Sequence, residues 1–273
     1  MYNMDLTEDQ IERYSRQIVL KEVGGIGQKK LLNSKVSLIG LGALGSSTAY
    51  YLVAAGIGSL RIIDFDLVEI SNLHRQILHF TTDINKIKTK SAAEKLNALN
   101  PDCNIEIIND RISSKNSKEL LKGSDFVIEG SDNLPTKMLI NDTCISLKIP
   151  FTIAGVLRFH GQIMTMVPEN KTACYRCVFG DRTEGDSSMS CSQAGVIGFV
   201  PGVLGCLEAN EALKYILNVG ELLTNKILYV DLLRYSFDFI EVHRDTNCLA
   251  CGDQAKDLVE TLNYGGLDAC NDQ

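Results

Sequence analysis

The segment from Lys35 to Asp66 restricts the fold more than any other part of the chain. Its apolar residues 36–39 predict a buried parallel strand, and the Gly-Leu-Gly-Ala-Leu-Gly motif that follows has the glycine spacing of a nucleotide-binding turn. In such a turn Gly40 permits the sharp bend, Gly42 permits close approach of the backbone to phosphate, and Gly45 permits the next helix to pack on the strand. We therefore expect a bound nucleotide, although these glycines also permit a tight strand-to-helix connection that binds nothing.

A helix and a second buried strand are predicted after this turn, over residues 46–55 and 60–63. The N-terminus of the helix favours an anion, and Gly56 ends the helix. Asp64 follows the second strand, 24 residues after the first glycine of the motif. This is close to the roughly 20-residue spacing at which a carboxylate binds ribose hydroxyls, so we expect Asp64 to bind the sugar of a nucleotide.

Strand and helix patterns keep alternating through the first 155 residues. Strands are predicted at 105–108, 125–129 and 151–154, and helices at 89–99, 117–122 and 135–147. This alternation predicts an α/β fold with a doubly wound, mainly parallel, Rossmann-like sheet and sites at the carboxyl ends of its strands. Farther along, antiparallel strands are expected to extend the sheet at 158–167, with Gly161-Gln162 in a turn, and at 227–231 and 236–242, beside an apolar helix at 205–217.

The N-terminal part is predicted to be helical. Thr7 and Gln10 match a capping box that begins an amphipathic helix over residues 7–21, and a second short helix is expected over 28–33.

Composition and charge exclude some classes of function. The net charge of -7 argues against a nucleic-acid binder, because phosphate contacts require a basic face. No apolar run approaches the roughly 18 residues that span a bilayer, and the polar, acidic N-terminus does not resemble a signal peptide. We therefore expect a cytoplasmic protein that contacts neither nucleic acid nor membrane.

Four of the nine cysteines form two Cys-x-x-Cys pairs. Cys174, Cys177, Cys248 and Cys251 supply the four thiolates of a closed, structural zinc site. The 70 residues between the pairs mean that such an ion ties the C-terminal part back onto the sheet. Two disulfides, an iron–sulfur cluster or a redox pair are the alternatives.

Polar and cationic residues gather beside the predicted nucleotide turn. Lys88 and Arg75 are suited to neutralise the α- and β-phosphates of a triphosphate, and Asp132 follows a predicted strand, where it is suited to hold Mg²⁺. A dinucleotide dehydrogenase has no need of so many cations near its phosphates. The candidate cofactor-binding residues outside the glycine motif are Asp64, Asp66, Ser71, Asn72, Leu73, His74, Arg75, Gln76, Lys88, Asp132 and Asn133.

Cys191 lies apart from the other thiols, in a polar segment without periodicity over residues 180–193. It is a candidate nucleophile or sulfur relay, and the alternative is an ordinary free cysteine.

Together these motifs resemble the MoeB/ThiF/HesA group, the bacterial relatives of ubiquitin-activating enzymes. The resemblance extends from Leu6 to Gly252. It includes Arg-Tyr-Ser-Arg-Gln near the start, the glycine motif, Asp-Phe-Asp, Ser-Asn-Leu-His-Arg-Gln, Lys88, Gly-Ser-Asp-Asn and both Cys-x-x-Cys pairs. Ala43 departs from the family, in which glycine is frequent at this position.

The resemblance implies ATP-dependent adenylation of the C-terminal glycine of a ubiquitin-like, β-grasp sulfur carrier, for molybdopterin or thiamin synthesis. It implies that Gly42 and Ala43 line the nucleotide by their backbone, that Asn72 joins Arg75 and Lys88 on the phosphates, and that Arg16 reaches the partner's triphosphate across a homodimer. ATP, Mg²⁺ and Zn²⁺ are the implied cofactors, and a cysteine desulfurase is a candidate sulfur donor. The thiol at Cys191 has a role in only some branches of the family.

One adenylation domain is therefore expected over residues 1–252. It consists of an N-terminal helical arm (1–34), a nucleotide-binding part (35–155) and a carrier-binding and zinc part (156–252), with a peripheral tail at 253–273. The alternatives are adenylation of a peptide or small-molecule carboxylate, a nicotinamide-dependent oxidoreductase, and a non-catalytic binding subunit.

Overall fold

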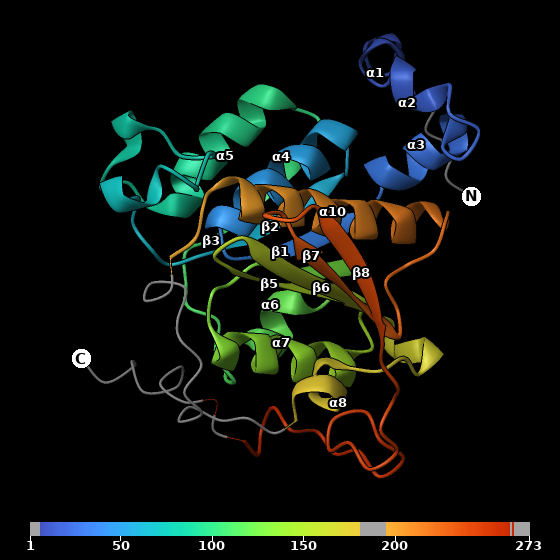
Figure 1. The fold of residues 1–273 in the computed structure, drawn as a ribbon. Coiled ribbons are helices and arrows are strands. Elements are labelled where there is room, and N and C mark those ends of the chain that lie inside the picture. Colours follow the sequence, from blue (N-terminus) through green and yellow to red (C-terminus); the bar gives the residue numbers. More distant parts are fainter. Residues whose placement is uncertain (1–5, 181–194, 263, 265–273) are drawn as a thin grey trace.

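The computed structural model describes residues 6–180, 195–262 and 264. In this part of the chain, strands form one eight-stranded sheet in the order β3-β2-β1-β4-β5-β6-β7-β8 (Figure 1). The strands are β1 Lys35–Ile39, β2 Ser59–Ile63, β3 Asn104–Ile108, β4 Phe126–Glu129, β5 Phe151–Leu157, β6 His160–Met166, β7 Lys226–Asp231 and β8 Ser236–Glu241.

The first five strands are parallel and the last three extend the sheet antiparallel, which confirms the predicted fold class. The chain runs from β1 outward to β2 and β3, and then returns to the other side of β1 for β4 and β5. The strand order therefore reverses between β1 and β4. In open α/β sheets a ligand binds at such a switch point, beyond the carboxyl ends of the strands.

Helices cover both faces of the sheet (Figure 1). α4, α5 and α10 lie on one face, and α6, α7 and α8 lie on the other. The α-helices are α1 Glu8–Arg13, α2 Ser15–Ile18, α3 Gly24–Leu32, α4 Ala43–Ala55, α5 Lys88–Leu99, α6 Ser117–Leu121, α7 Leu134–Leu147, α8 Tyr175–Phe179 and α10 Phe199–Leu217. Among the described helices, none has both the length and the apolar character that crossing a membrane requires.

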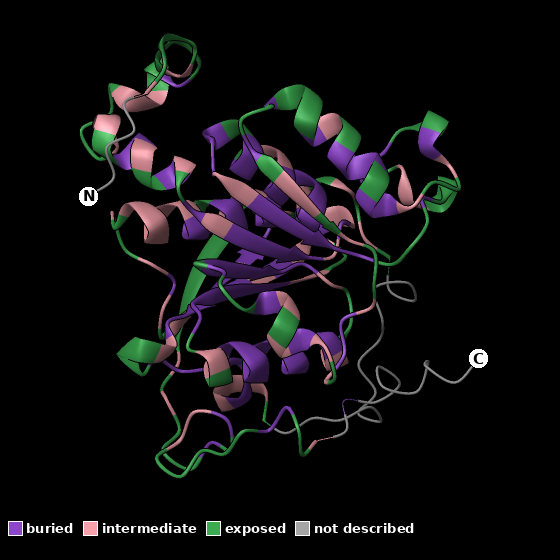
Figure 2. Cartoon of the chain, turned by 180° about the vertical axis from the view of Figure 1, so that it is seen from behind, coloured by how far each residue is buried: buried purple, intermediate pink, exposed green. Residues whose placement is uncertain are grey.

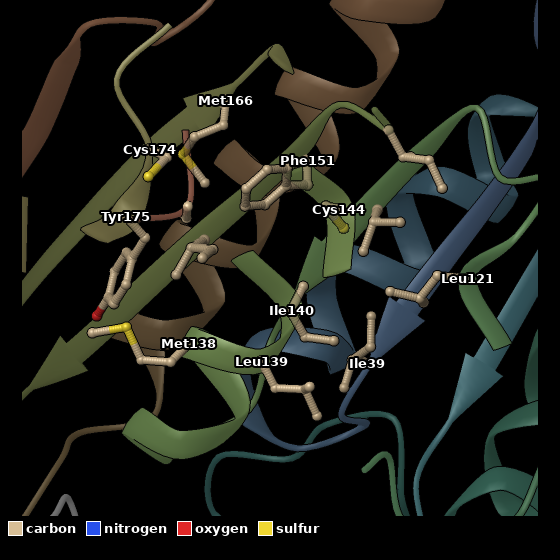
Figure 3. Close-up of a cluster of buried hydrophobic side chains, with 14 of the residues drawn as sticks. Ile39, Leu121, Met138, Leu139, Ile140, Cys144, Phe151, Met166, Cys174 and Tyr175 are labelled. Carbon is tan, nitrogen blue, oxygen red and sulfur yellow. The ribbon is translucent and has the colours of Figure 1, made fainter. Parts of the chain in front are cut away.

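The core lies between these layers, and the central strands are buried along most of their length (Figure 2). On the α7 side, Leu139 and Ile140 pack with Ile39 at the end of β1 and with Phe151 of β5 (Figure 3). The same cluster includes Cys174, so one continuous core connects the sheet to the first Cys-x-x-Cys pair.

The N-terminal helix predicted over residues 7–21 is divided into α1 and α2, although its capping box between Thr7 and Gln10 is confirmed. The division occurs at Tyr14, whose ring is buried against Gly56. Asn100 Nδ2 donates to the Tyr14 hydroxyl at 2.8 Å. Tyr14 and its partners are far apart in the chain, so the local periodicity that predicted one continuous helix could not indicate this contact.

The prediction of a turn at Gly161-Gln162 is wrong, because both residues lie inside β6 and pair with Val156 and Gly155 of β5. The connection between the two strands lies just before, at Arg158, which has a positive φ of 56°. Gly161 is needed there for packing, since a Cβ atom at this position would lie 2.5 Å from the Leu204 side chain of α10.

The residues after Gly252 pack against α6 and α7. Leu258 and Val259 are buried, and Lys118 of α6 forms an ion pair with Asp257. The Tyr264 hydroxyl donates to Asp142 of α7 at 2.6 Å. This part of the tail therefore contributes to the core around α7.

Candidate active site

A cavity of about 850 Å³ opens at the switch point of the sheet. Its walls are the segments that follow β1, β2, β3 and β4, together with the first turns of α4 and α7. These are the carboxyl ends of the parallel strands, as the sequence predicts, and the volume is in the range of pockets that hold a nucleotide-sized ligand.

Two glycines bring the turns after β1 and β4 together. Gly130 N–H donates to the carbonyl of Ile39 at 2.9 Å, so the two turns share a backbone hydrogen bond. Gly40 has a φ of +87°, and a Cβ atom on it would lie 2.9 Å from the carbonyl oxygen of Gly130. A side chain at Gly40 is therefore excluded both by backbone conformation and by space.

Gly42 and Gly45 have different surroundings. A Cβ atom on Gly45 would lie 2.0 Å from the Gly40 carbonyl oxygen, which leaves no room between helix and turn. The nearest atom to a Cβ on Gly42 is Gln76 Nε2, at 3.7 Å, and Gly42 lines the cavity. Since Gly42 also N-caps α4, its open side faces the place where a phosphate would meet the helix N-terminus.

We expect Gly45→Ala to lower the free energy of unfolding by about 3 kcal/mol or more, because the methyl group collides with backbone. Gly42→Ala is the matched control for folding, and its expected cost is below about 1 kcal/mol. Its effect is expected instead on ATP affinity, since the methyl group enters the cavity. Urea denaturation and calorimetric titration with ATP measure the two effects, and equal stability losses for the two variants would contradict this assignment.

Asp64 is buried at the end of β2 and lines the cavity. One carboxylate oxygen accepts from the backbone N–H of Leu41 at 2.7 Å, and the other accepts from the N–H of Asp66 at 2.8 Å. Burial raises the pKa of Asp64, while the nearby Lys88 ammonium and these two N–H groups oppose that shift. Asp64 thus connects the β2 turn to the glycine turn, and its remaining lone pairs are available to ribose hydroxyls.

His79 stabilises the glycine turn through a hydrogen bond to Leu41. Its Nε2 lies 3.0 Å from the Leu41 carbonyl oxygen and its Nδ1 lies 2.9 Å from Ser91 Oγ. Because a carbonyl oxygen only accepts, Nε2 carries the proton and the Ser91 hydroxyl donates to Nδ1. Burial lowers the pKa of His79 to about 4, so the ring is neutral in the native protein near pH 7.

This pKa predicts a loss of stability on acidification. Between the ordinary histidine pKa of about 6.5 and the native value, the unfolded chain binds a proton that the native protein does not. The contribution of His79 to the free energy of unfolding is therefore fully present above pH 6.5. It falls by up to roughly 3 kcal/mol as the pH approaches 4. Urea titrations across that range, compared with those of His79→Gln, isolate this contribution. A decline in the variant as steep as in the wild type would refute it.

Lys88 and Arg75 are two of the cations in the cavity wall. Lys88 begins α5, is almost fully buried, and donates from Nζ to Asp66 at 2.9 Å. An ammonium group has two further N–H donors, which remain for an anion. Arg75 donates to the Ser71 carbonyl at 2.9 Å, which braces its side chain against its own loop.

Two buried polar atoms at the cavity lack a hydrogen-bond partner within the described residues. They are Gln76 Oε1 and Ser131 Oγ. Buried polar groups are normally satisfied, so these two are positions where a bound ligand would complete the hydrogen bonding.

The structure brings most of the predicted residues to this one cavity. Those that line it are Gly40, Gly42, Ala43, Asp64, Asp66, Ser71, His74, Arg75, Gln76, Lys88, Asp132 and Asn133. Gly45, Asn72, Leu73 and Arg16 do not line it: Gly45 lies beneath the turn, and Arg16 lies on α2 of the N-terminal arm. Cys191 lies outside the described residues.

The sequence interpretation missed several lining residues with chemistry of their own, among them Phe65, Arg111 and Lys137. Phe65 and Arg111 stack at 4.3 Å, and Lys137 lies on the first turns of α7. Helical periodicity was the available signal for Lys137, since it follows Asn133 by four residues and so shares its helix face. No local signal pairs Phe65 with Arg111, because they follow different strands.

The two Cys-x-x-Cys pairs meet in one cluster, and none of its four cysteines lines the cavity. The Sγ atoms of Cys174, Cys177, Cys248 and Cys251 all lie within 4.8 Å of one another, and none is in a disulfide. Neighbouring Sγ atoms lie 3.3–3.8 Å apart, whereas a tetrahedral zinc with bonds of about 2.3 Å separates them by about 3.8 Å. Four converging thiols fit a structural zinc ion and leave no position for a substrate.

The fold and the site together define a class of nucleotide-binding protein. Its features are an open α/β sheet, a glycine turn at the switch point, a cavity with cations and carboxylates, and a cluster of four cysteines. The chain belongs to the ThiF family, whose model matches residues 14–250. The motif resemblance found in the sequence is thereby confirmed.

Two named relatives match along nearly their whole length. The SAMP-activating enzyme E1 of Haloferax volcanii is 39% identical over 98% of this chain and 97% of the relative. The sulfur carrier protein adenylyltransferase of Thermus thermophilus is 38% identical over 97% of this chain and 100% of the relative. Among solved structures, E. coli MccB with ATP is 25% identical, with a TM-score of 0.77 over 88% of this chain and 74% of that one.

Proposed function

We propose that this protein uses ATP to adenylate the C-terminal glycine carboxylate of a ubiquitin-like sulfur carrier, giving an acyl-adenylate and pyrophosphate for sulfur transfer. The observation that carries the proposal is the convergence of Arg75, Lys88, Asp64 and Asp132 on one cavity at the switch point. The names of the two full-length relatives support the same reaction.

The chemistry requires charge neutralisation more than proton transfer. A C-terminal carboxylate has a pKa of about 3.5 and is already ionised at neutral pH, so the attack on the α-phosphate needs no general base. The obstacle is the repulsion between the carboxylate and the triphosphate. Lys88 and Arg75, with the N-terminus of α4, lower this repulsion and align the pyrophosphate for departure.

The other residues hold the nucleotide in place. Asp64 binds the ribose hydroxyls, and the backbone at Gly42 and Ala43 approaches the phosphates. Asp132 lies in the cavity wall and forms no ion pair with any residue that the structure describes, so its carboxylate fits a Mg²⁺ ligand. Bound Mg²⁺ supplies further neutralisation of the triphosphate charge.

Arg16 acts from a second copy of the chain in this proposal. It is exposed on α2 and does not reach the cavity of its own chain. A homodimer that places Arg16 at the partner's triphosphate adds a further cation to the site.

The first test is carrier-dependent ATP–pyrophosphate exchange. We expect Lys88→Ala and Asp132→Ala each to lower exchange by at least about 100-fold, because each removes charge stabilisation from a preorganised site. Lys90→Ala is the matched control: Lys90 is exposed on the same helix and does not line the cavity.

Full exchange in both variants would overturn the assigned roles. If only a peptide or a small carboxylate supports exchange, that compound and not a carrier protein is the substrate. Tight binding of NAD, without binding of ATP, would contradict adenylation and favour an oxidoreductase.

The cysteine cluster is proposed to bind one structural Zn²⁺. We expect Cys248→Ser to lose the metal, measured by elemental analysis, and to unfold at a temperature lower by roughly 10 °C or more, because metal binding and folding are coupled. Cys206→Ser, outside the cluster, is the control and keeps one zinc per chain. Iron with sulfide in the wild-type protein, or no metal at all, would contradict the zinc assignment.

A further inference from the structure

Lys137 lines the floor of the cavity, yet all its hydrogen-bonding capacity is used inside the protein. Its Nζ donates to Glu129 Oε2 at 2.5 Å, to the Ser131 carbonyl at 2.8 Å and to the Ala154 carbonyl at 2.7 Å. An ammonium group has three N–H donors, so none is left for a phosphate. The effect of Lys137 on a ligand must therefore pass through the residues that it holds.

Two of these residues, Glu129 and Ser131, belong to the segment that leads into Asp132, whereas Ala154 lies in β5. Glu129 is fully buried, and its second oxygen accepts from the Ser131 N–H at 2.9 Å. Both peptide groups of Ser131 are thus bonded to the Glu129–Lys137 pair, one to each member. On the other side of Asp132, Asn133 N-caps α7 by accepting from the Thr136 N–H at 2.9 Å. Asp132 lies between two fixed residues.

We propose that Glu129 and Lys137 are a positioning pair that holds the Ser131–Asp132 backbone so that the Asp132 carboxylate faces the metal of a bound nucleotide. This inference rests on the proposed role of Asp132. It adds two residues that do not touch the substrate but determine how well the site binds a divalent cation.

The charges around the pair are balanced. Burial is the largest influence on the pKa of Lys137 and lowers it, but Glu129, together with Tyr175 and Glu208, makes the net shift upward, so the amine stays charged. Glu208 of α10 lies near both, and burial raises its pKa well above the ordinary value, which favours its neutral form. The buried site therefore holds one positive and one negative charge, and removal of either alone leaves the other unpaired.

For this reason the test uses a variant that neutralises both members. In Glu129→Gln/Lys137→Met no buried charge is left unpaired, but the bonds from Nζ to Ser131 and Ala154 are lost. Lys137→Arg is the conservative variant, with five N–H donors to restore them. Calorimetric titrations of ATP at increasing Mg²⁺ give the metal dependence of nucleotide binding without any carrier, and thermal unfolding checks the fold.

We expect the double variant to unfold cooperatively and to need about tenfold more Mg²⁺ for half-maximal effect on ATP binding, with ATP affinity in EDTA unchanged. The single variant Lys137→Arg should have a Mg²⁺ requirement within about threefold of that of the wild type. A double variant with the wild-type Mg²⁺ requirement would overturn the inference, as would an equal loss of affinity with and without Mg²⁺, which marks a merely structural role.

The two proposals can fail separately. Wild-type protein that binds ATP in a Mg²⁺-dependent way but adenylates no carrier would refute the proposed function and leave the positioning pair intact. Wild-type protein whose ATP binding ignores Mg²⁺ would refute the positioning pair, because Asp132 would then hold no metal.

Discussion

The hydrogen bond from Gly130 N–H to the Ile39 carbonyl joins the turns after β1 and β4, and the rest of the site depends on this close approach. It places the glycine turn, which receives phosphate, directly beside the segment that carries Asp132. The approach requires glycine at position 40, where φ is positive and a Cβ would collide with the neighbouring turn. The reversal of strand order at β1 and β4 leaves space beyond these turns, and the cavity occupies it.

Around this junction the two buried lysines form ion pairs, and some polar atoms remain available to a ligand. Lys88 is held by Asp66, and Lys137 by Glu129, so neither cation is buried without a partner. The two differ in what remains: Lys88 keeps donors for an anion, whereas Lys137 has none left and acts on the backbone around Asp132. A single cavity can thus contain one lysine that binds phosphate and another that shapes the site.

Much of this arrangement could be predicted because its signals are local. The glycine spacing, the strand-to-acid spacing at Asp64 and each of the two Cys-x-x-Cys pairs lie within a short stretch. The structure places Gly42 and Asp64 at one cavity and the four cysteines in one cluster. The misses concern partners that lie far apart in the chain. Tyr14 divides the N-terminal helix because it packs on Gly56, and Lys137 of α7 bonds to Ala154 of β5. Hydrophobic periodicity carries no information about such pairs, since they exist only once the sheet has formed.

The central claim is that ATP binds with its triphosphate between the glycine turn and the cationic wall. A crystal structure of the protein with ATP and Mg²⁺ tests this claim most directly. It should place the phosphates over Gly42, with Lys88 and Arg75 in hydrogen-bond contact and Asp132 ligating the metal. Phosphates that turn away from Lys88 and Arg75, or a nucleotide bound outside the switch-point cavity, would contradict it.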